Sequence, residues 1–147
     1  MNYTADLAAP AASPAALARD FMVVKHPTLK PDMPILKAVD LFLKTGVTGA
    51  PVVDQYDRLL GILTEKDCIK LLAKRSYYHE EPERTVADDM ATGIKTVDAQ
   101  TDLQKIVDIF LGSPFRQLPV VDADNRLVGM ISRRDVVQVI QKMNKRR

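Results

Sequence analysis

One internal repeat constrains what this chain can fold into more than any other feature. The segment Pro51-Val52-Val53-Asp54 recurs as Pro119-Val120-Val121-Asp122, an offset of 68 residues. The same offset, without a gap, aligns Asp67 with Asp135. The chain therefore contains one structural unit twice. A single copy of this size would bury too little surface to form much of a core, so the two copies are expected to pack together.

The repeat divides the chain into five parts. The two copies cover residues 18–75 and 86–143, and a polar, proline-containing linker at 76–85 joins them. An alanine- and proline-rich arm at 1–17 has few bulky groups to bury, so we expect it to be flexible. A basic tail at 144–147 ends the chain.

Each copy shows the same order of predicted elements: a strand, a helix, a hairpin of two strands and a second helix. The initial strands are predicted at 22–28 and 94–97. Apolar residues at i, i+3, i+4 and i+7 predict the first helices, and apolar runs divided by turn residues predict the hairpins. We therefore expect an α/β (α+β) fold of two strand-helix-strand-strand-helix units packed through their sheets. The valines expected to be buried there are Val52, Val53, Val120 and Val121.

Composition argues against several classes of protein. The net charge is only +2, from 21 basic and 19 acidic residues, so nucleic acid is not expected as a partner. The single cysteine, Cys68, cannot form an internal disulfide, and His79 is expected to be solvated rather than bound to a metal. No apolar run reaches the roughly 18–20 residues of a membrane helix, and no signal peptide is predicted. We expect a cytoplasmic protein without membrane contact.

A second shared pattern, Gly-hydrophobic-x-Ser/Thr-x-x-Asp, marks the end of each hairpin. Its hydroxyl suits a helix N-cap, and its carboxylate can accept two hydrogen bonds, as paired ribose hydroxyls require. The helix N-terminus beside it offers N–H donors and a positive dipole end to phosphate. The alternative is that the hydroxyls are only caps and the carboxylates only acidic residues of a first turn. The residues concerned are Thr64 and Asp67 in the first copy, and Ser132 and Asp135 in the second.

The chain resembles the cystathionine-beta-synthase (CBS) domain in three features: the order of its elements, the run Leu-Pro-Val-Val-Asp at 118–122 and the repeated glycine-to-aspartate motif. The resemblance covers residues 18–143 and implies a stand-alone tandem pair, or Bateman module, with pseudo-two-fold symmetry. Many such pairs bind an adenosine-containing ligand in clefts between the repeats: AMP, ADP, ATP or S-adenosylmethionine. No catalytic cofactor is implied.

The resemblance also implies two clefts, each combining the motif of one copy with a wall from the other. The first would combine Met130, Ser132, Asp135, Arg116, Arg133, Arg134, Val47, Lys25 and His26. The second would combine Ile62, Thr64, Asp67, Thr48, Phe115 and Lys95. The first cleft gathers more basic groups, and guanidinium groups can chelate phosphate. The alternative for any one of these cations is a solvated surface charge.

Two details favour the first cleft as the principal adenine-nucleotide site. Bulky Phe115 stands at the second cleft, where it would crowd or stack on a base. The second copy has Gln117 where the first has Gly49, which offers no side-chain contact, so the second cleft loses one possible phosphate ligand. We therefore expect AMP, ADP or ATP chiefly around Ser132 and Asp135.

We compare three candidate functions for this chain. The first is a regulatory sensor that binds an adenine nucleotide and signals to an unknown partner, and the second is a structural or dimerising module with empty clefts. An enzyme is disfavoured, because the sequence has no Gly-rich phosphate loop, nucleophile elbow or metal cluster. Cys68 lies at an apolar position and is expected to be an inert thiol. A homodimer is expected, because Leu41 and Ile109 lie off the main apolar stripes.

Overall fold

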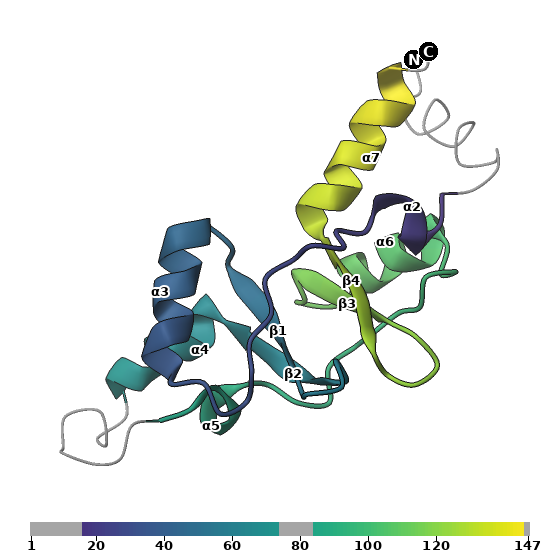
Figure 1. Ribbon diagram of the computed structural model, residues 1–147. Coiled ribbons are helices and arrows are strands. Elements are labelled where there is room, and N and C mark those ends of the chain that lie inside the picture. Colours follow the sequence, from purple (N-terminus) through teal and green to yellow (C-terminus); the bar gives the residue numbers. More distant parts are fainter. Residues whose placement is uncertain (1–15, 74–83, 146–147) are drawn as a thin grey trace. The chain divides into compact units, whose positions relative to one another are not determined.

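A computed structural model describes residues 16–73 and 84–145 (Figure 1). Most of the predicted arm and linker, with His79, and the last two residues of the tail lie outside the described residues. The described chain forms two compact units. The α3 unit comprises residues 26–73, 84–94 and 124–127, and the α6 unit comprises residues 16–25, 95–123 and 128–145.

Both units contain a helix followed by an antiparallel hairpin and a second helical segment. The elements of the α3 unit are α3 (Ile35–Thr45), β1 (Gly49–Val53), β2 (Leu59–Thr64), α4 (Glu65–Ile69), η1 (Lys70–Ala73) and α5 (Val86–Asp89). Those that lie mainly in the α6 unit are α2 (Ala18–Phe21), α6 (Leu103–Gly112), β3 (Gln117–Val121), β4 (Leu127–Ser132) and α7 (Arg133–Lys145). The predicted mixed fold of two similar repeats is therefore confirmed.

Each hairpin takes its second edge partner from the other sequence copy. Ile62 of β2 exchanges two backbone hydrogen bonds, of 3.0 and 2.8 Å, with Ala91. Met130 of β4 exchanges two, of 3.0 and 2.8 Å, with Val23. An edge strand otherwise leaves unpaired N–H and C=O groups. The compact units are therefore not the same divisions of the chain as the sequence repeats.

This exchange corrects the predicted initial strands. Residues 22–28 form no continuous strand: Val23 pairs with β4 in the α6 unit, whereas Leu29 forms a parallel bridge to Val52 in the α3 unit. Residues 94–97 likewise hold one bridge, from Val97 to Val120. The chain passes from one unit to the other inside each predicted strand, so neither strand is continuous within one sheet.

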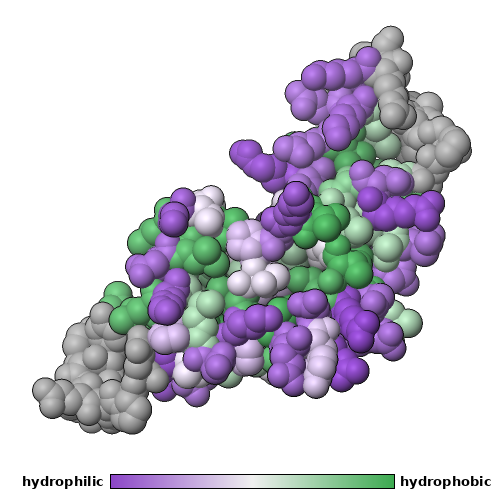
Figure 2. Space-filling view, in the orientation of Figure 1, coloured by the Kyte–Doolittle hydropathy of each residue, from purple (hydrophilic) through white to green (hydrophobic). Residues whose placement is uncertain are grey.

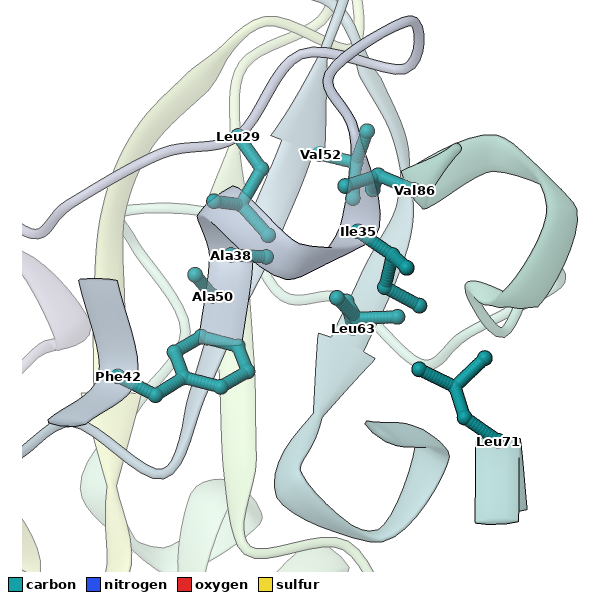
Figure 3. Packing of buried hydrophobic residues seen from close by; sticks show 9 residues of the cluster. All are labelled: Leu29, Ile35, Ala38, Phe42, Ala50, Val52, Leu63, Leu71 and Val86. Carbon is teal, nitrogen blue, oxygen red and sulfur yellow. The ribbon is translucent and has the colours of Figure 1, made fainter. Parts of the chain in front are cut away.

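The core of each unit lies between the hairpin and its helices. In the α3 unit, α3 buries Ile35, Ala38 and Phe42 against the strands, and Val52 and Leu63 meet them from β1 and β2 (Figure 3). A corresponding cluster in the α6 unit is built from Val97, Ile106, Phe110, Leu118, Val120 and Ile131. The predicted valines are buried, except that Val121 is partly exposed.

The glycine of each shared motif is explained by a methionine that packs on it. A Cβ atom added to Gly129 would lie 2.7 Å from Sδ of Met22. One added to Gly61 would lie 3.0 Å from Sδ of Met90 and closer still to the backbone oxygen of Ala91. Both positions therefore need a residue without a side chain, since the exchanged segments lie directly against them.

We predict that Gly61→Ala destabilises the protein more than Gly129→Ala. At Gly61 the new methyl group meets a backbone oxygen, whereas at Gly129 the near atoms belong to a flexible methionine. Overpacking of this kind costs about 1–3 kcal/mol. Urea unfolding of both variants measures the effect, with Gly112→Ala as control, because that position has open space around it. An unchanged Gly61→Ala midpoint would contradict the described packing.

Candidate functional site

The end of β4 and the start of α7 are joined by a reciprocal cap. The backbone N–H and the Oγ–H of Ser132 both donate to Oδ2 of Asp135, at 2.7 and 2.9 Å. The backbone N–H of Asp135 donates to Oγ of Ser132 at 3.2 Å. This is a capping box, so the alternative that these residues cap a helix describes what the structure shows of them. Oδ1 of Asp135 receives no hydrogen bond from the described residues and can still accept one.

The first copy builds the same cap with one difference. The backbone N–H and Oγ1–H of Thr64 donate to Oδ2 of Asp67 at 2.9 and 3.0 Å. Oδ1 of Asp67, however, lies 3.9 Å from Nζ of Lys70. The equivalent position in the second copy is Gln138, which carries no charge. The sequence analysis did not single out Lys70, although its spacing of three residues from Asp67 on a helix is the signal for this pair.

The helices that follow the two caps differ in length. Helix α7 runs for 13 residues, whereas α4 ends after 5 and continues as the 3-10 turn η1. A helix N-terminus attracts anions through its free N–H groups and the sum of its aligned peptide dipoles. Helix α7 therefore has the larger sum of aligned peptide dipoles.

Three arginines lie at or next to the start of α7 in the fold. Arg133 and Arg134 open the helix, and the backbone N–H of Arg133 donates to the carbonyl of Arg116 at 3.2 Å. Nε of Arg133 also donates to the carbonyl of Phe115 at 3.2 Å. These bonds hold the start of α7 against the backbone of Phe115 and Arg116, the two residues that precede β3. All three arginine side chains are exposed, so they remain accessible to a ligand.

The structure divides the residues predicted for each cleft between the two units. Of the first set, Met130, Ser132, Asp135, Arg116, Arg133, Arg134 and Lys25 lie in the α6 unit, while Val47 and His26 lie in the α3 unit. Of the second set, Ile62, Thr64, Asp67 and Thr48 lie in the α3 unit, while Phe115 and Lys95 lie in the α6 unit. Each motif is thus assembled inside one unit, and the walls expected from the other copy stay predictions.

Three of these residues have defined local roles. Nδ1 of His26 lies 2.9 Å from the carbonyl of Pro27, so Nδ1–H is the donor there. Val47 packs against the core of the α3 unit, and the carbonyl of Thr48 accepts the N–H of Glu65 at 2.9 Å. These residues support the fold around the site in addition to any contact with a ligand.

The described residues hold no grouping of histidine, cysteine and carboxylate side chains suited to a metal ion. Cys68 is half-buried beside the core of the α3 unit. Desolvation, followed by the nearby carboxylate of Asp67, raises the pKa of its thiol to about 11. The thiol is thus protonated near neutral pH and is a poor nucleophile or metal ligand.

No helix in residues 16–73 and 84–145 combines the length and the apolar character that a membrane span requires.

Comparisons with known proteins agree with this architecture. CBSX2 of Arabidopsis thaliana, described as a CBS-pair protein, is 28% identical with a TM-score of 0.79, covering 89% of this chain and 98% of that chain. CBSX2 in complex with AMP is 29% identical with a TM-score of 0.80, covering 87% of this chain and 98% of that chain. These structures share both the fold and the pairing of two domains.

Curated relatives match over part of their own length. Inosine-5'-monophosphate dehydrogenase of Aquifex aeolicus is 28% identical over 80% of this chain but only 23% of its own length. The chloroplastic CBS domain-containing protein CBSX1 of Arabidopsis thaliana is 28% identical over 81% of this chain and 61% of its own length. The model of the CBS domain matches residues 18–74 and 86–142, which include nearly all of both copies. The chain therefore belongs to the CBS domain family and carries two copies of that domain.

Proposed function

We propose that this protein is a regulatory module that binds an adenine nucleotide and passes its occupancy to a partner protein. The observation that carries the proposal is the cap at the start of α7, where one carboxylate oxygen of Asp135 receives no hydrogen bond from the described residues. Arg133 and Arg134 belong to the same first turn, and the backbone of Arg133 is bonded to that of Arg116. The likeness to CBSX2, which is described in complex with AMP, supports an adenosine-containing ligand. AMP, ADP and ATP all carry the required ribose and phosphate.

Each part of a nucleotide has a chemical counterpart in the α6 unit. Oδ1 of Asp135 accepts from a ribose hydroxyl while Oδ2 stays engaged with Ser132. The positive end of the α7 dipole favours a phosphate, and Arg116 with Arg134 neutralises its charge. Arg133 is partly held by the carbonyl of Phe115, so we assign it a weaker contribution.

The corresponding position in the α3 unit is a weaker site for a nucleotide. Nζ of Lys70 lies 3.9 Å from Oδ1 of Asp67, the oxygen that would accept from ribose, and α4 has a short peptide dipole. We therefore assign the principal site to Ser132 and Asp135, and a secondary site to Thr64 and Asp67. S-adenosylmethionine is the alternative ligand, since it shares the ribose but carries no phosphate.

We predict that Asp135→Ala weakens the binding of AMP, ADP and ATP by about tenfold to a hundredfold. A hydrogen bond to a charged group contributes roughly 1.5–3 kcal/mol, and each 1.4 kcal/mol is tenfold in affinity. Asp67→Ala is the matched control, because it removes the same kind of cap from the secondary site. Calorimetric titration of both variants measures the difference.

Two outcomes of that titration would count against the proposal. Normal binding by Asp135→Ala with loss of binding by Asp67→Ala would move the principal site to the α3 unit. No binding of any adenosine compound by the unaltered protein up to millimolar concentration would favour the structural module with empty clefts. Melting temperatures of both variants show whether the loss of a cap has unfolded either one.

A regulatory role without catalysis is part of the proposal, and the state of Cys68 bears on it. We predict that iodoacetamide modifies Cys68 slowly at pH 8, because burial and nearby carboxylates raise the thiol pKa to about 11 and leave little thiolate. In urea the pKa returns toward its ordinary value of about 8.5, and the reaction becomes fast. Mass spectrometry follows the modification. Rapid modification of the folded protein at pH 8 would reveal an activated thiol and reopen the enzyme hypothesis.

A homodimer also belongs to the proposal, although different residues now support it. Leu41 and Ile109, named from the sequence, are partly buried against the cores of their own units. Their neighbours Leu43 and Leu111 occupy matched positions in the two copies and are 77% and 83% exposed. Apolar patches also interrupt the charged surface in Figure 2.

We predict that Leu43→Lys combined with Leu111→Lys converts a dimer to a monomer. Exposed apolar side chains of this size gain free energy when a second copy covers them, and a buried lysine reverses the gain. Light scattering at micromolar concentration measures the mass, and Lys44→Ala is the control on the same helix. A monomeric unaltered protein of about 16 kDa, the mass of one chain, would contradict the dimer.

A further inference from the structure

Helix α7 presents an exposed stripe on which every side chain can donate a hydrogen bond. The residues recur at i, i+4, i+7 and i+11, the spacing that keeps side chains on one face of a helix. They are Arg134, Gln138, Gln141 and Lys145, and Lys142 lies beside Lys145 at a spacing of three. All five side chains are exposed. We call these five residues the basic face of α7.

The basic face lies opposite the side by which α7 contacts its own unit. Val136, Val139 and Met143 follow the spacing i, i+3 and i+7 and are partly buried. Val136 packs against the core of the α6 unit. The helix therefore rests on its apolar side, and hydrophilic residues cover much of it on the side that Figure 2 shows. The basic face is not needed to hold α7 in place, so another molecule can bind it.

The charge of α7 has no counterpart in the first copy. Helix α7 holds four basic residues and one acidic residue, a net charge of +3 (4 − 1), whereas α4 with η1 holds two of each and is neutral. Within the described residues, no carboxylate forms an ion pair with Arg134, Lys142 or Lys145. The helix dipole favours cations in the last turn but disfavours Arg134 in the first. The dipole alone therefore does not explain the basic face.

The chemistry of the basic face favours carboxylates. Guanidinium, ammonium and amide groups donate hydrogen bonds, whereas ionised Asp and Glu side chains only accept them, and such charge-assisted bonds are strong. Eleven residues of helix rise about 17 Å, so an acidic helix of about three turns can lie along the whole stripe. A membrane surface fits less well, because helices that bind lipid insert a large apolar side and the basic face has no apolar side chain.

We infer that the basic face of α7 is the docking surface for an acidic helical segment of the regulated partner, and that a bound nucleotide weakens this docking. The inference rests on the proposed function and deepens it. Arg134 belongs both to the basic face and to the proposed phosphate contacts, so a bound phosphate competes with the partner for it. Lys142 lies about 12 Å further along the helix axis, close to the Debye length of about 10 Å at 0.1 M salt. The phosphate charge therefore also weakens the attraction at Lys142, and by linkage the partner weakens nucleotide binding.

The first test measures the binding of a fluorescent helical peptide of glutamate, alanine and leucine, about 20 residues long, by anisotropy. Lys142→Glu combined with Lys145→Glu should weaken binding about tenfold, because two attractive charges become repulsive. Lys37→Glu combined with Lys44→Glu is the matched control: it changes the net charge equally, but on α3, and should bind the peptide normally. Equal losses in both variants, or equal binding of a peptide with glutamine in place of glutamate, would overturn the inference.

The second test adds nucleotide to the complex of protein and peptide. ATP should weaken peptide binding more than AMP does, and adenosine, which has no phosphate, should leave it unchanged. In Asp135→Ala the same ATP concentration should have little effect, because that variant keeps the basic face but binds nucleotide weakly. An equal effect of ATP on Asp135→Ala would mean that ATP competes directly for the lysines, and this result would overturn the coupling.

The remaining outcomes separate the inference from the proposed function. Nucleotide binding by calorimetry without any binding of the peptide, or with peptide binding that ATP does not change, would overturn the inference and leave the proposed function intact. Tighter binding of phosphatidylserine vesicles than of the peptide would also overturn it, since a membrane would then be the partner. Normal peptide binding by a protein that binds no nucleotide would refute the proposed function and leave the docking surface supported.

Discussion

The pairing of each hairpin with a segment of the other sequence copy is the constraint from which the remaining structure follows. An edge strand needs partners for its backbone groups, and Ala91 supplies them to β2 as Val23 does to β4. The segments that bring these residues also lay methionines on the motif glycines, Gly61 and Gly129. The shared motif therefore has three linked parts. Its glycine leaves room for a segment of the other copy, its strand pairs with that segment, and its cap starts the helix that follows.

The two copies of the motif form caps with the same hydrogen bonds but different surroundings. Lys70 stands against one aspartate, and a neutral glutamine takes its place in the second copy. The cap is followed by an α-helix of 5 residues and a 3-10 turn in one copy, and by a helix of 13 residues in the other. A group of arginines accompanies the longer helix. These differences are the reason that we propose the cap of the second copy as the principal nucleotide site.

Local patterns in the sequence predicted the elements but not their partners. The apolar spacing of α3 and α6 predicted their buried faces, and the motif predicted both caps, because these features depend on residues a few positions apart. The segment of Val23 was assigned to a continuous strand over residues 22–28, since nothing within those residues indicates that the chain leaves one unit for the other there. Leu41 and Leu43 flank the α3 stripe on opposite sides, and only the neighbouring elements decide that Leu41 is partly covered. The expectation that the other copy supplies part of the wall of each cleft also depends on contacts between residues that are distant in the sequence.

The most direct test of the central claim is an AMP titration of the isotope-labelled protein, followed by backbone amide chemical shifts. Bound phosphate and ribose change the environment of the amides that they contact, residue by residue. The account predicts the largest shifts at Ser132–Val136, where the cap and the first turn of α7 lie, with smaller shifts at Thr64–Cys68. Shifts centred on Thr64–Cys68, or the absence of shifts at both caps, would contradict it.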